Sequence, residues 1–261
     1  MTTAFVTGAS SGIGEEFARQ LAAQNTNLIL VARSQEKLEK LASQLQQKYQ
    51  IEAEVIVQDL TVSNAGKTVF DLIQQKGLTV DILINNAGFG DYGAFDSSDL
   101  SKQLQMIQLN IMVLTELTGL FLPLMKSQGR GSIVNISSIA GFQPLPYMSV
   151  YAATKAFVLS FTEALWAENK DSGLRILAVC PGPTESDFFN KADFPDSFTK
   201  SQSSNMTMTP TEDVVTETLK TLDKKQSTLV TGGIANQIIV NIPRFVPRDF
   251  LVNAVEKQFK V

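Results

Sequence analysis

Seven short apolar segments alternate along this 261-residue chain with longer stretches of helical periodicity. Strands are predicted over residues 3–8, 27–33, 52–58, 80–86, 131–138, 174–180 and 227–232. Helices are predicted over residues 11–24, 34–49, 63–76, 98–126, 149–170 and 210–223. Strands that are apolar on both faces are typical of a parallel sheet covered by helices on both sides, and right-handed crossovers then produce a doubly wound fold. The sequence therefore predicts a single α/β domain, with a Rossmann-like, seven-stranded parallel sheet between two layers of helices.

Two segments interrupt this alternation. Residues 181–209 are rich in Phe, Ser, Asp and Met without clear periodicity, and so long a loop in a compact domain is usually functional or mobile. Residues 233–261 follow the last predicted strand and are apolar, with two prolines. We expect residues 1–232 to form one Rossmann-type domain. Residues 233–261 should pack on that domain or at a subunit interface, with contact to a membrane surface as the less favoured alternative.

The composition excludes several kinds of site. The chain has no histidine and one cysteine, Cys180, which excludes a Ser-His-Asp triad, a Cys-His nucleophile and a disulfide within the chain. We predict no metal site, and we expect Cys180 to be a small buried residue at the end of a strand. A net charge of −4 without a basic cluster argues against nucleic acid as a partner. The first residues do not resemble a signal peptide, and no run of about 18 apolar residues occurs, so a cytoplasmic protein is expected.

The first predicted strand leads into a glycine-rich turn, TGASSGIG, at residues 7–14. Its glycines are Gly8, Gly12 and Gly14. Glycines between a strand and a helix let the backbone approach a pyrophosphate, which then binds at the helix N-terminus. Such a turn could also simply connect the two elements, but its place after the first strand favours a dinucleotide site.

The end of the second predicted strand distinguishes between dinucleotides. A NAD site places Asp or Glu about 20 residues after the glycines, where the carboxylate binds the ribose 2′-hydroxyl. This strand ends instead in Ala32, Arg33 and Ser34. The planar guanidinium of Arg33 could pair with a 2′-phosphate, although Arg33 could also be a solvated surface residue. We therefore predict NADP(H) as the cofactor.

Further short motifs follow in a definite order. They are Asp59-Leu60, NNAG at 85–88, Asn110, SS at 137–138, YAATK at 151–155 and PG at 181–182. With the glycine turn they make the chain resemble the short-chain dehydrogenase/reductase family over about its first 232 residues, because that family carries these motifs in this order and at this spacing. Each motif alone is a weak signal, whereas the ordered set is specific.

The resemblance implies a role for each matching position. The catalytic group would be Ser138, Tyr151, Lys155 and Asn110. The cofactor site would contain Gly8, Ser10, Ser11, Gly12, Ile13, Gly14, Asp59, Leu60, Asn86, Ala87, Gly88, Tyr151, Lys155, Pro181 and Gly182, in addition to Arg33.

Two of the implied roles are less definite. The family's usual threonine five residues after the proline of PG is Ser186 in this chain, with Thr184 nearby, so the hydroxyl that meets the nicotinamide carboxamide stays open. In the family the asparagine at the position of Asn110 holds a water that links the lysine to solvent. The alternative is that Asn110 is an exposed helix residue.

The chemistry agrees with the implied roles. Transfer of a hydride to a carbonyl carbon leaves an oxygen that needs a proton, and the protein must supply the acid. Without histidine, Tyr151 is the reasonable donor, but a tyrosine has an ordinary pKa of about 10. A nearby cation lowers such a pKa, and Lys155 lies four residues later, on the same helix face. Ser138 would hold the carbonyl oxygen near Tyr151. We therefore predict an NADP(H)-dependent oxidoreductase that acts on a carbonyl or secondary alcohol.

Apolar residues in the predicted loops indicate the class of substrate. They are Phe89, Tyr92, the segment FQPLPYM at 142–148, Phe188, Phe189, Phe194 and Phe198. Such a lining suits a lipophilic ketone or a 3-oxoacyl compound, although these aromatics could merely pack on the domain.

Two further hypotheses concern assembly and activity. The helices at 98–126 and 149–170 resemble those through which the family forms homodimers and homotetramers. A non-catalytic NADP(H)-binding sensor on the same fold is the alternative to an enzyme. Sensors commonly lose the tyrosine or the lysine, and both are present in this chain.

Overall fold

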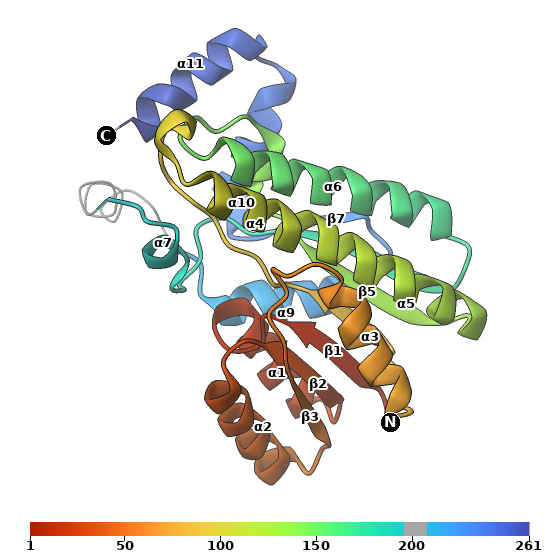
Figure 1. Ribbon diagram of the computed structural model, residues 1–261. Helices are drawn as coiled ribbons and strands as arrows, with labels where there is room; N and C mark the ends of the chain where they lie inside the picture. The colour runs from red at the N-terminus through yellow and green to blue at the C-terminus, as the bar shows by residue number, and fades with distance from the viewer. Residues whose placement is uncertain (196–207, 261) are drawn as a thin grey trace.

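The computed structural model describes residues 1–195 and 208–260 and confirms the predicted α/β fold (Figure 1). One parallel sheet has the strand order β3-β2-β1-β4-β5-β6-β7. Its strands are β1 (Thr3–Thr7), β2 (Asn27–Ala32), β3 (Ala53–Val57), β4 (Ile82–Asn85), β5 (Gly131–Ile136), β6 (Leu174–Cys180) and β7 (Thr228–Val230). Cys180 is fully buried at the end of β6, as expected. Phe198, one of the predicted substrate-loop aromatics, lies outside the described residues.

Helices cover both faces of the sheet. The helices of the described residues are α1 (Gly12–Ala23), α2 (Gln35–Tyr49), α3 (Ala65–Gln75), α4 (Leu100–Ile107), α5 (Leu114–Gln128), α6 (Ser149–Asn169), α7 (Phe188–Lys191), α9 (Thr211–Leu222), α10 (Gly233–Asn241) and α11 (Arg248–Phe259), of which α7 and α11 lie away from the sheet. Short 3₁₀ helices span Phe95–Ser97, Ile139–Phe142 and Ile242–Arg244. Successive strand residues point to opposite faces, so Ala4 and Val6 pack with α1, α2 and α9, whereas Phe5 packs with α3 and α5.

The order of the strands creates a crevice in the middle of the sheet. The chain starts at β1, adds strands outward to β3, and then returns to place β4 on the other side of β1. Helices that follow β1 and β4 therefore diverge, and ligands of such sheets bind beside the carboxyl ends of these strands. The glycine turn after β1 and the NNAG segment after β4 lie together at this point.

The predicted uninterrupted helix over residues 98–126 is wrong in one respect. A π-helical segment, Gln108–Val113, separates α4 from α5 and contains Asn110. The wider turn inserts an extra residue, and such insertions frequently occur at functional sites.

The same helical run, Leu100–Gln128, is long and apolar enough by length and composition to cross a membrane, with a mean hydropathy of 1.5. Leu117, Phe121 and Met125 nevertheless face the sheet in the buried core. The run therefore packs as a covering helix of the sheet.

Candidate functional site

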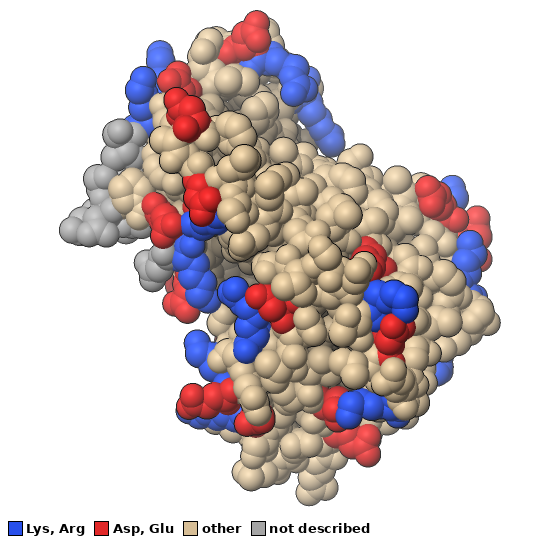
Figure 2. All heavy atoms as spheres, viewed as in Figure 1, with Lys and Arg blue, Asp and Glu red and all other residues tan. Residues whose placement is uncertain are grey.

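A cleft of about 1530 Å³ opens at the carboxyl ends of the strands. Figure 2 shows it as a hollow between the part of the molecule that carries the sheet and the part that carries α11. The predicted site residues that line it are Gly8, Ser10, Ser11, Gly12, Ile13, Arg33, Asp59, Leu60, Asn86, Ala87, Gly88, Ser138, Tyr151, Lys155, Pro181, Gly182, Thr184 and Ser186. Gly14 and Asn110 are not part of the lining and lie behind it.

The glycine turn packs too tightly for side chains. Gly8 and Gly12 have φ values of +67° and +58°, a backbone conformation that favours glycine. A Cβ on Gly8 would lie 2.9 Å from Nδ2 of Asn86, and one on Gly14 would lie 2.4 Å from the carbonyl oxygen of Gly8. Ser11, the N-cap of α1, makes no side-chain capping bond, so it leaves the first N–H groups of the helix available to an anion.

Thr7 fastens the segment after β4 to the glycine turn, a role that we did not predict. Its hydroxyl oxygen accepts hydrogen bonds of 3.0 Å from the backbone N–H groups of Asn86 and Ala87. The Asn86 side chain in turn donates to the Thr7 carbonyl oxygen at 3.0 Å. The two loops on either side of the crevice are therefore held as one unit.

A basic pair lies at the end of β2. Arg33 and Lys37 are both exposed and both line the cleft. We did not predict Lys37, although its position one helical turn after Arg33 was visible in the sequence. Burial acts to raise the pKa of Asp59, at the end of β3, but hydrogen bonds from Thr61 and the charge of Arg33 outweigh burial and lower it. This end of the cleft thus offers two cations and one carboxylate.

The tyrosine, lysine and serine meet in the wall of the cleft. Tyr151 and Lys155 occupy the first turns of α6 and are 8% and 6% exposed. Nζ of Lys155 lies 5.7 Å from the centre of the Tyr151 ring and donates to the carbonyl oxygen of Ile136 at 2.9 Å. Ser138 lies two residues after the end of β5, and its hydroxyl accepts a 3.1 Å hydrogen bond from the backbone N–H of Ala140.

Burial dominates the electrostatics of this group. It raises the pKa of Tyr151 to about 12, while a hydrogen bond with Ser138 acts in the opposite direction. It also lowers the pKa of Lys155 to about 8. We predicted that Lys155 lowers the pKa of Tyr151, but the loss of solvent around the phenol is the largest effect and raises that pKa.

Asn110 is a buried residue, so the alternative of an exposed helix asparagine is wrong. It is 1% exposed. Its Nδ2 donates to the carbonyl oxygen of Phe89 at 3.0 Å and to Oγ1 of Thr154 at 3.1 Å. Its Oδ1 accepts from the backbone N–H of Phe89 at 3.2 Å. The side chain therefore ties the segment after β4 to α6, one residue before Lys155.

Thr184 and Ser186 both stay available as hydroxyls of the segment after PG. Thr184 donates to the carbonyl oxygen of Gly182 at 2.9 Å. Ser186 makes a longer bond of 3.4 Å to the carbonyl oxygen of Thr184 and lies across the cleft wall from Gly12. A Cβ on Gly182 would lie 2.2 Å from Nδ2 of Asn236, which places α10 against this segment.

Apolar side chains gather at the other end of the cleft. The predicted loops supply Phe89, Leu145, Met148, Phe188, Phe189 and Phe194, and the carboxyl-terminal elements add Ile239 and Phe259. The Phe188 ring lies 5.3 Å from the Tyr151 ring. The expectation fails for Tyr92, Phe142, Pro144, Pro146 and Tyr147, which are not part of the lining. Phe142 packs near Cys180 and Leu159, whereas Tyr92 packs on Tyr147 and Phe194.

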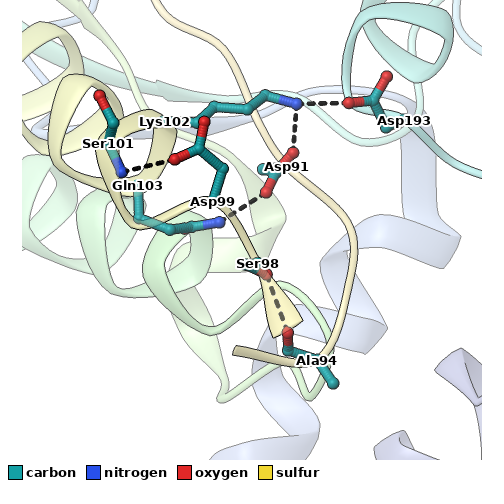
Figure 3. Close-up of polar contacts among 8 residues, drawn as sticks. All are labelled: Asp91, Ala94, Ser98, Asp99, Ser101, Lys102, Gln103 and Asp193. Atoms are coloured by element: carbon teal, nitrogen blue, oxygen red, sulfur yellow. Dashed lines mark hydrogen bonds and ion pairs between the residues drawn. The ribbon is translucent and has the colours of Figure 1, made fainter. Parts of the chain in front are cut away.

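A polar cluster fixes one edge of this apolar end (Figure 3). Lys102 of α4 forms ion pairs with Asp91 and Asp193, the latter at 2.5 Å. Gln103 donates to Asp91 at 2.6 Å. Burial acts to lower the pKa of Lys102, but its bonds to the two carboxylates outweigh burial and raise it. Lys102 therefore links the loop after β4 to the segment that carries Phe188 and Phe194.

Comparisons with known proteins agree with this geometry. A family model described as short chain dehydrogenase matches residues 2–195. Over 184 residues the chain is 39% identical to a very-long-chain 3-oxoacyl-CoA reductase of Anas platyrhynchos and 35% identical to that of Homo sapiens. These matches cover 68% of this chain and 58% of each relative, so the chain spans less than two thirds of their length.

Solved structures give the same result. A short-chain dehydrogenase from Sphingobium yanoikuyae in complex with NADPH has a TM-score of 0.82 and 31% identity, over 91% of both chains. A bulky-bulky ketone specific alcohol dehydrogenase from Comamonas testosteroni has a TM-score of 0.78 and 31% identity, over 91% of this chain and 89% of that one.

Replacement of Lys155 by methionine is expected to stabilise the fold at pH 7. A lysine whose pKa falls from 10.5 to about 8 on folding destabilises the protein fully below about pH 8, and this effect disappears as the pH rises through 10.5. The stability gain of Lys155→Met over wild type should therefore shrink across that interval, which urea unfolding at the two ends measures. Lys40→Met, at an exposed position of α2, is the control; a gain that does not change with pH would contradict the assignment.

Replacement of Lys102 by methionine is expected to loosen the segment that carries Phe188. The backbone N–H of Tyr92 donates to the carbonyl oxygen of Ala192 at 2.9 Å. Hydrogen exchange at this amide therefore reports how often the segment separates from the loop after β4. Loss of both ion pairs of Lys102, together worth about 1 kcal/mol, should speed the hydrogen exchange of this amide about fivefold. Lys67→Met, which removes the exposed Lys67–Asp71 pair, is the control. Unchanged exchange at Tyr92 would show that the cluster does not hold the segment.

Proposed function

The chain belongs to the short-chain dehydrogenase/reductase family, and on that premise we propose that it is an NADP(H)-dependent oxidoreductase of carbonyl or secondary alcohol substrates. The observation that carries the proposal is the meeting of Ser138, Tyr151 and Lys155 in one cleft wall, between the glycine turn and an apolar pocket. Reduction of a lipophilic ketone or a 3-oxoacyl compound is the proposed direction.

The described residues fit the cofactor. Backbone at Gly8 and Gly12, where a side chain would collide or be strained, forms a cradle at the N-terminus of α1 for the pyrophosphate. Arg33 and Lys37 would pair with the 2′-phosphate at the end of β2. The segments Asn86–Gly88 and Pro181–Ser186 would hold the nicotinamide end. When bound, NADPH supplies the hydride.

Tyr151 supplies the proton. Its high pKa keeps the hydroxyl protonated at neutral pH, which is the form that a reductase needs. As negative charge grows on the substrate oxygen, the Ser138 hydroxyl can donate a hydrogen bond to it and hold it beside Tyr151. The Lys155 ammonium, 5.7 Å from the ring centre, favours the phenolate that remains. A Lys155 pKa of about 8 also lets this residue lose and regain a proton near neutral pH.

The apolar end of the cleft indicates the substrate class. Phe188 packs on Tyr151, and Phe194 packs on Tyr92. The relatives are named for very-long-chain 3-oxoacyl-CoA and for bulky ketones, which agrees with a large apolar carbonyl. The sensor alternative is not favoured, because the serine, tyrosine and lysine are all present and lie together.

We also propose a homodimer or homotetramer. Figure 2 shows a broad surface with few charges over α4, α5 and α6. Leu104 of α4, Met112 of the π-helical segment and Phe157 of α6 are exposed, and an unusually large exposed apolar patch commonly marks an interface.

Tyr151→Phe is expected to lower turnover of a ketone about 10²–10⁴-fold, because the phenyl ring has no proton to give. The dissociation constant for NADPH, measured by fluorescence titration, should stay within about twofold of wild type, because the ring and the turn remain. Tyr49→Phe, on α2, is the matched control. Near-normal turnover in Tyr151→Phe would remove the proposed acid.

Arg33→Asp is expected to reverse part of the cofactor preference. Loss of a charge-assisted bond to the 2′-phosphate should lower kcat/KM for NADPH about 10- to 100-fold relative to NADH. The measurement is the ratio of the two efficiencies, with Arg175→Asp as control, since Arg175 lies on β6 and pairs with Asp223. Equal losses for both cofactors would refute the role of Arg33.

A further inference from the structure

The carboxyl-terminal elements expose an unusual number of large apolar side chains. Ile234 and Ile238 of α10 are exposed, together with Ile242 and Phe245 between α10 and α11 and Phe250 in the first turn of α11. Ile234, Ile238 and Ile242 are four residues apart, so they form one stripe along the helix. Phe245 is 84% exposed. We call these five residues the α10–α11 apolar face.

The opposite sides of the same elements contact the cleft. Ile239 of α10 and Phe259 of α11 line it. Leu251 and Val255 of α11 are buried in a cluster with Met148 and Tyr151. In Figure 1, α11 stands at the end of the molecule away from α2 and β3. The apolar face and one wall of the proposed substrate pocket are therefore two sides of one structural unit.

The charges around the α10–α11 apolar face indicate what kind of surface it binds. Residues 233–261 carry four basic side chains (Arg244, Arg248, Lys257 and Lys260) and two acidic ones (Asp249 and Glu256), a net charge of +2 in a chain whose net charge is −4. Arg244 and Arg248 flank Phe245 and Phe250, and neither forms an ion pair within the described part of the chain. Apolar and aromatic side chains bordered by arginine are typical of segments that lie on anionic lipid.

We propose that the α10–α11 apolar face docks on an anionic lipid surface, and that a lipophilic substrate passes between this surface and the cleft. The second part rests on the proposed function, whereas the docking itself does not. A second copy of the chain suits the face less well, because a twofold contact would bring Arg244 and Arg248 of both copies toward each other.

The test is co-sedimentation of the full chain with vesicles of phosphatidylcholine containing phosphatidylglycerol, and with vesicles of phosphatidylcholine alone. Binding is expected to the anionic vesicles and to weaken with salt. Replacement of both phenylalanines, Phe245→Ser and Phe250→Ser, should weaken it at least about tenfold, since their burial in the interface is lost. Arg244→Gln and Arg248→Gln should each weaken it about fivefold, from about 1 kcal/mol per basic residue. Val62→Ser, at an exposed apolar position between β3 and α3 that lies outside the cleft and the proposed subunit interface, is the matched control.

Three results would overturn the proposal. They are no binding to anionic vesicles, equal binding by the Phe245→Ser/Phe250→Ser variant, and a dimer in sedimentation velocity that this variant dissociates while vesicles leave it intact. Activity separates the two proposals. The variant should reduce a water-soluble ketone at the wild-type rate and lose rate only with a substrate dissolved in vesicles. Tyr151→Phe should bind vesicles as wild type does, because Tyr151 is not part of the α10–α11 apolar face. Vesicle binding therefore tests the docking proposal even if the protein is not an oxidoreductase.

Discussion

The carboxyl ends of β1 and β4 lie side by side because the chain reverses the direction of sheet growth between them. Most of the candidate site depends on this placement. Thr7 can bond to the backbone of Asn86 and Ala87 only because the two strands are neighbours, and the absence of a side chain at Gly8 lets Asn86 approach. Strands β5 and β6 then bring Ser138 and the segment after Pro181 to the same edge. A groove formed by rigid strand ends positions groups more accurately than loops alone can.

The burial of Tyr151 and Lys155 sets the protonation equilibria of both side chains. Burying both residues on the first turns of α6 moves their pKa values apart, raising that of Tyr151 to about 12 and lowering that of Lys155 to about 8. Each shift disfavours the charged form because water is excluded. The site therefore disfavours a single unpaired charge on either side chain, but it tolerates a negative and a positive charge that form together. Such a site holds Tyr151 neutral until negative charge develops on a substrate.

Polar contacts from distant parts of the chain support this wall. Asn110, in the π-helical segment, fastens the loop that carries Phe89 to α6. Lys102 joins the loop at Asp91 to the segment at Asp193. The carboxyl-terminal helices complete the apolar end with Ile239 and Phe259. The pocket for the substrate is thus assembled from three regions, whereas the cradle for the cofactor comes mainly from the turns after β1, β2 and β4.

The sequence by itself determined the strands, the helices between them and their parallel arrangement, and it predicted most residues of the candidate site, because these depend on short-range patterns. It did not predict α7, α10 or α11. Apolar runs with helical stretches between them define the sheet, glycines define the turn after β1, and a spacing of four places Tyr151 and Lys155 on one helix face. Only the tertiary structure decided the π-helical segment, the partners of Lys102 and Asn110, the separation of Phe142 and Tyr92 from the pocket, and the dominance of burial over the charge of Lys155. Each of these depends on contacts between residues far apart in the chain and on how much water the packing excludes, and neither quantity is a local property of the sequence.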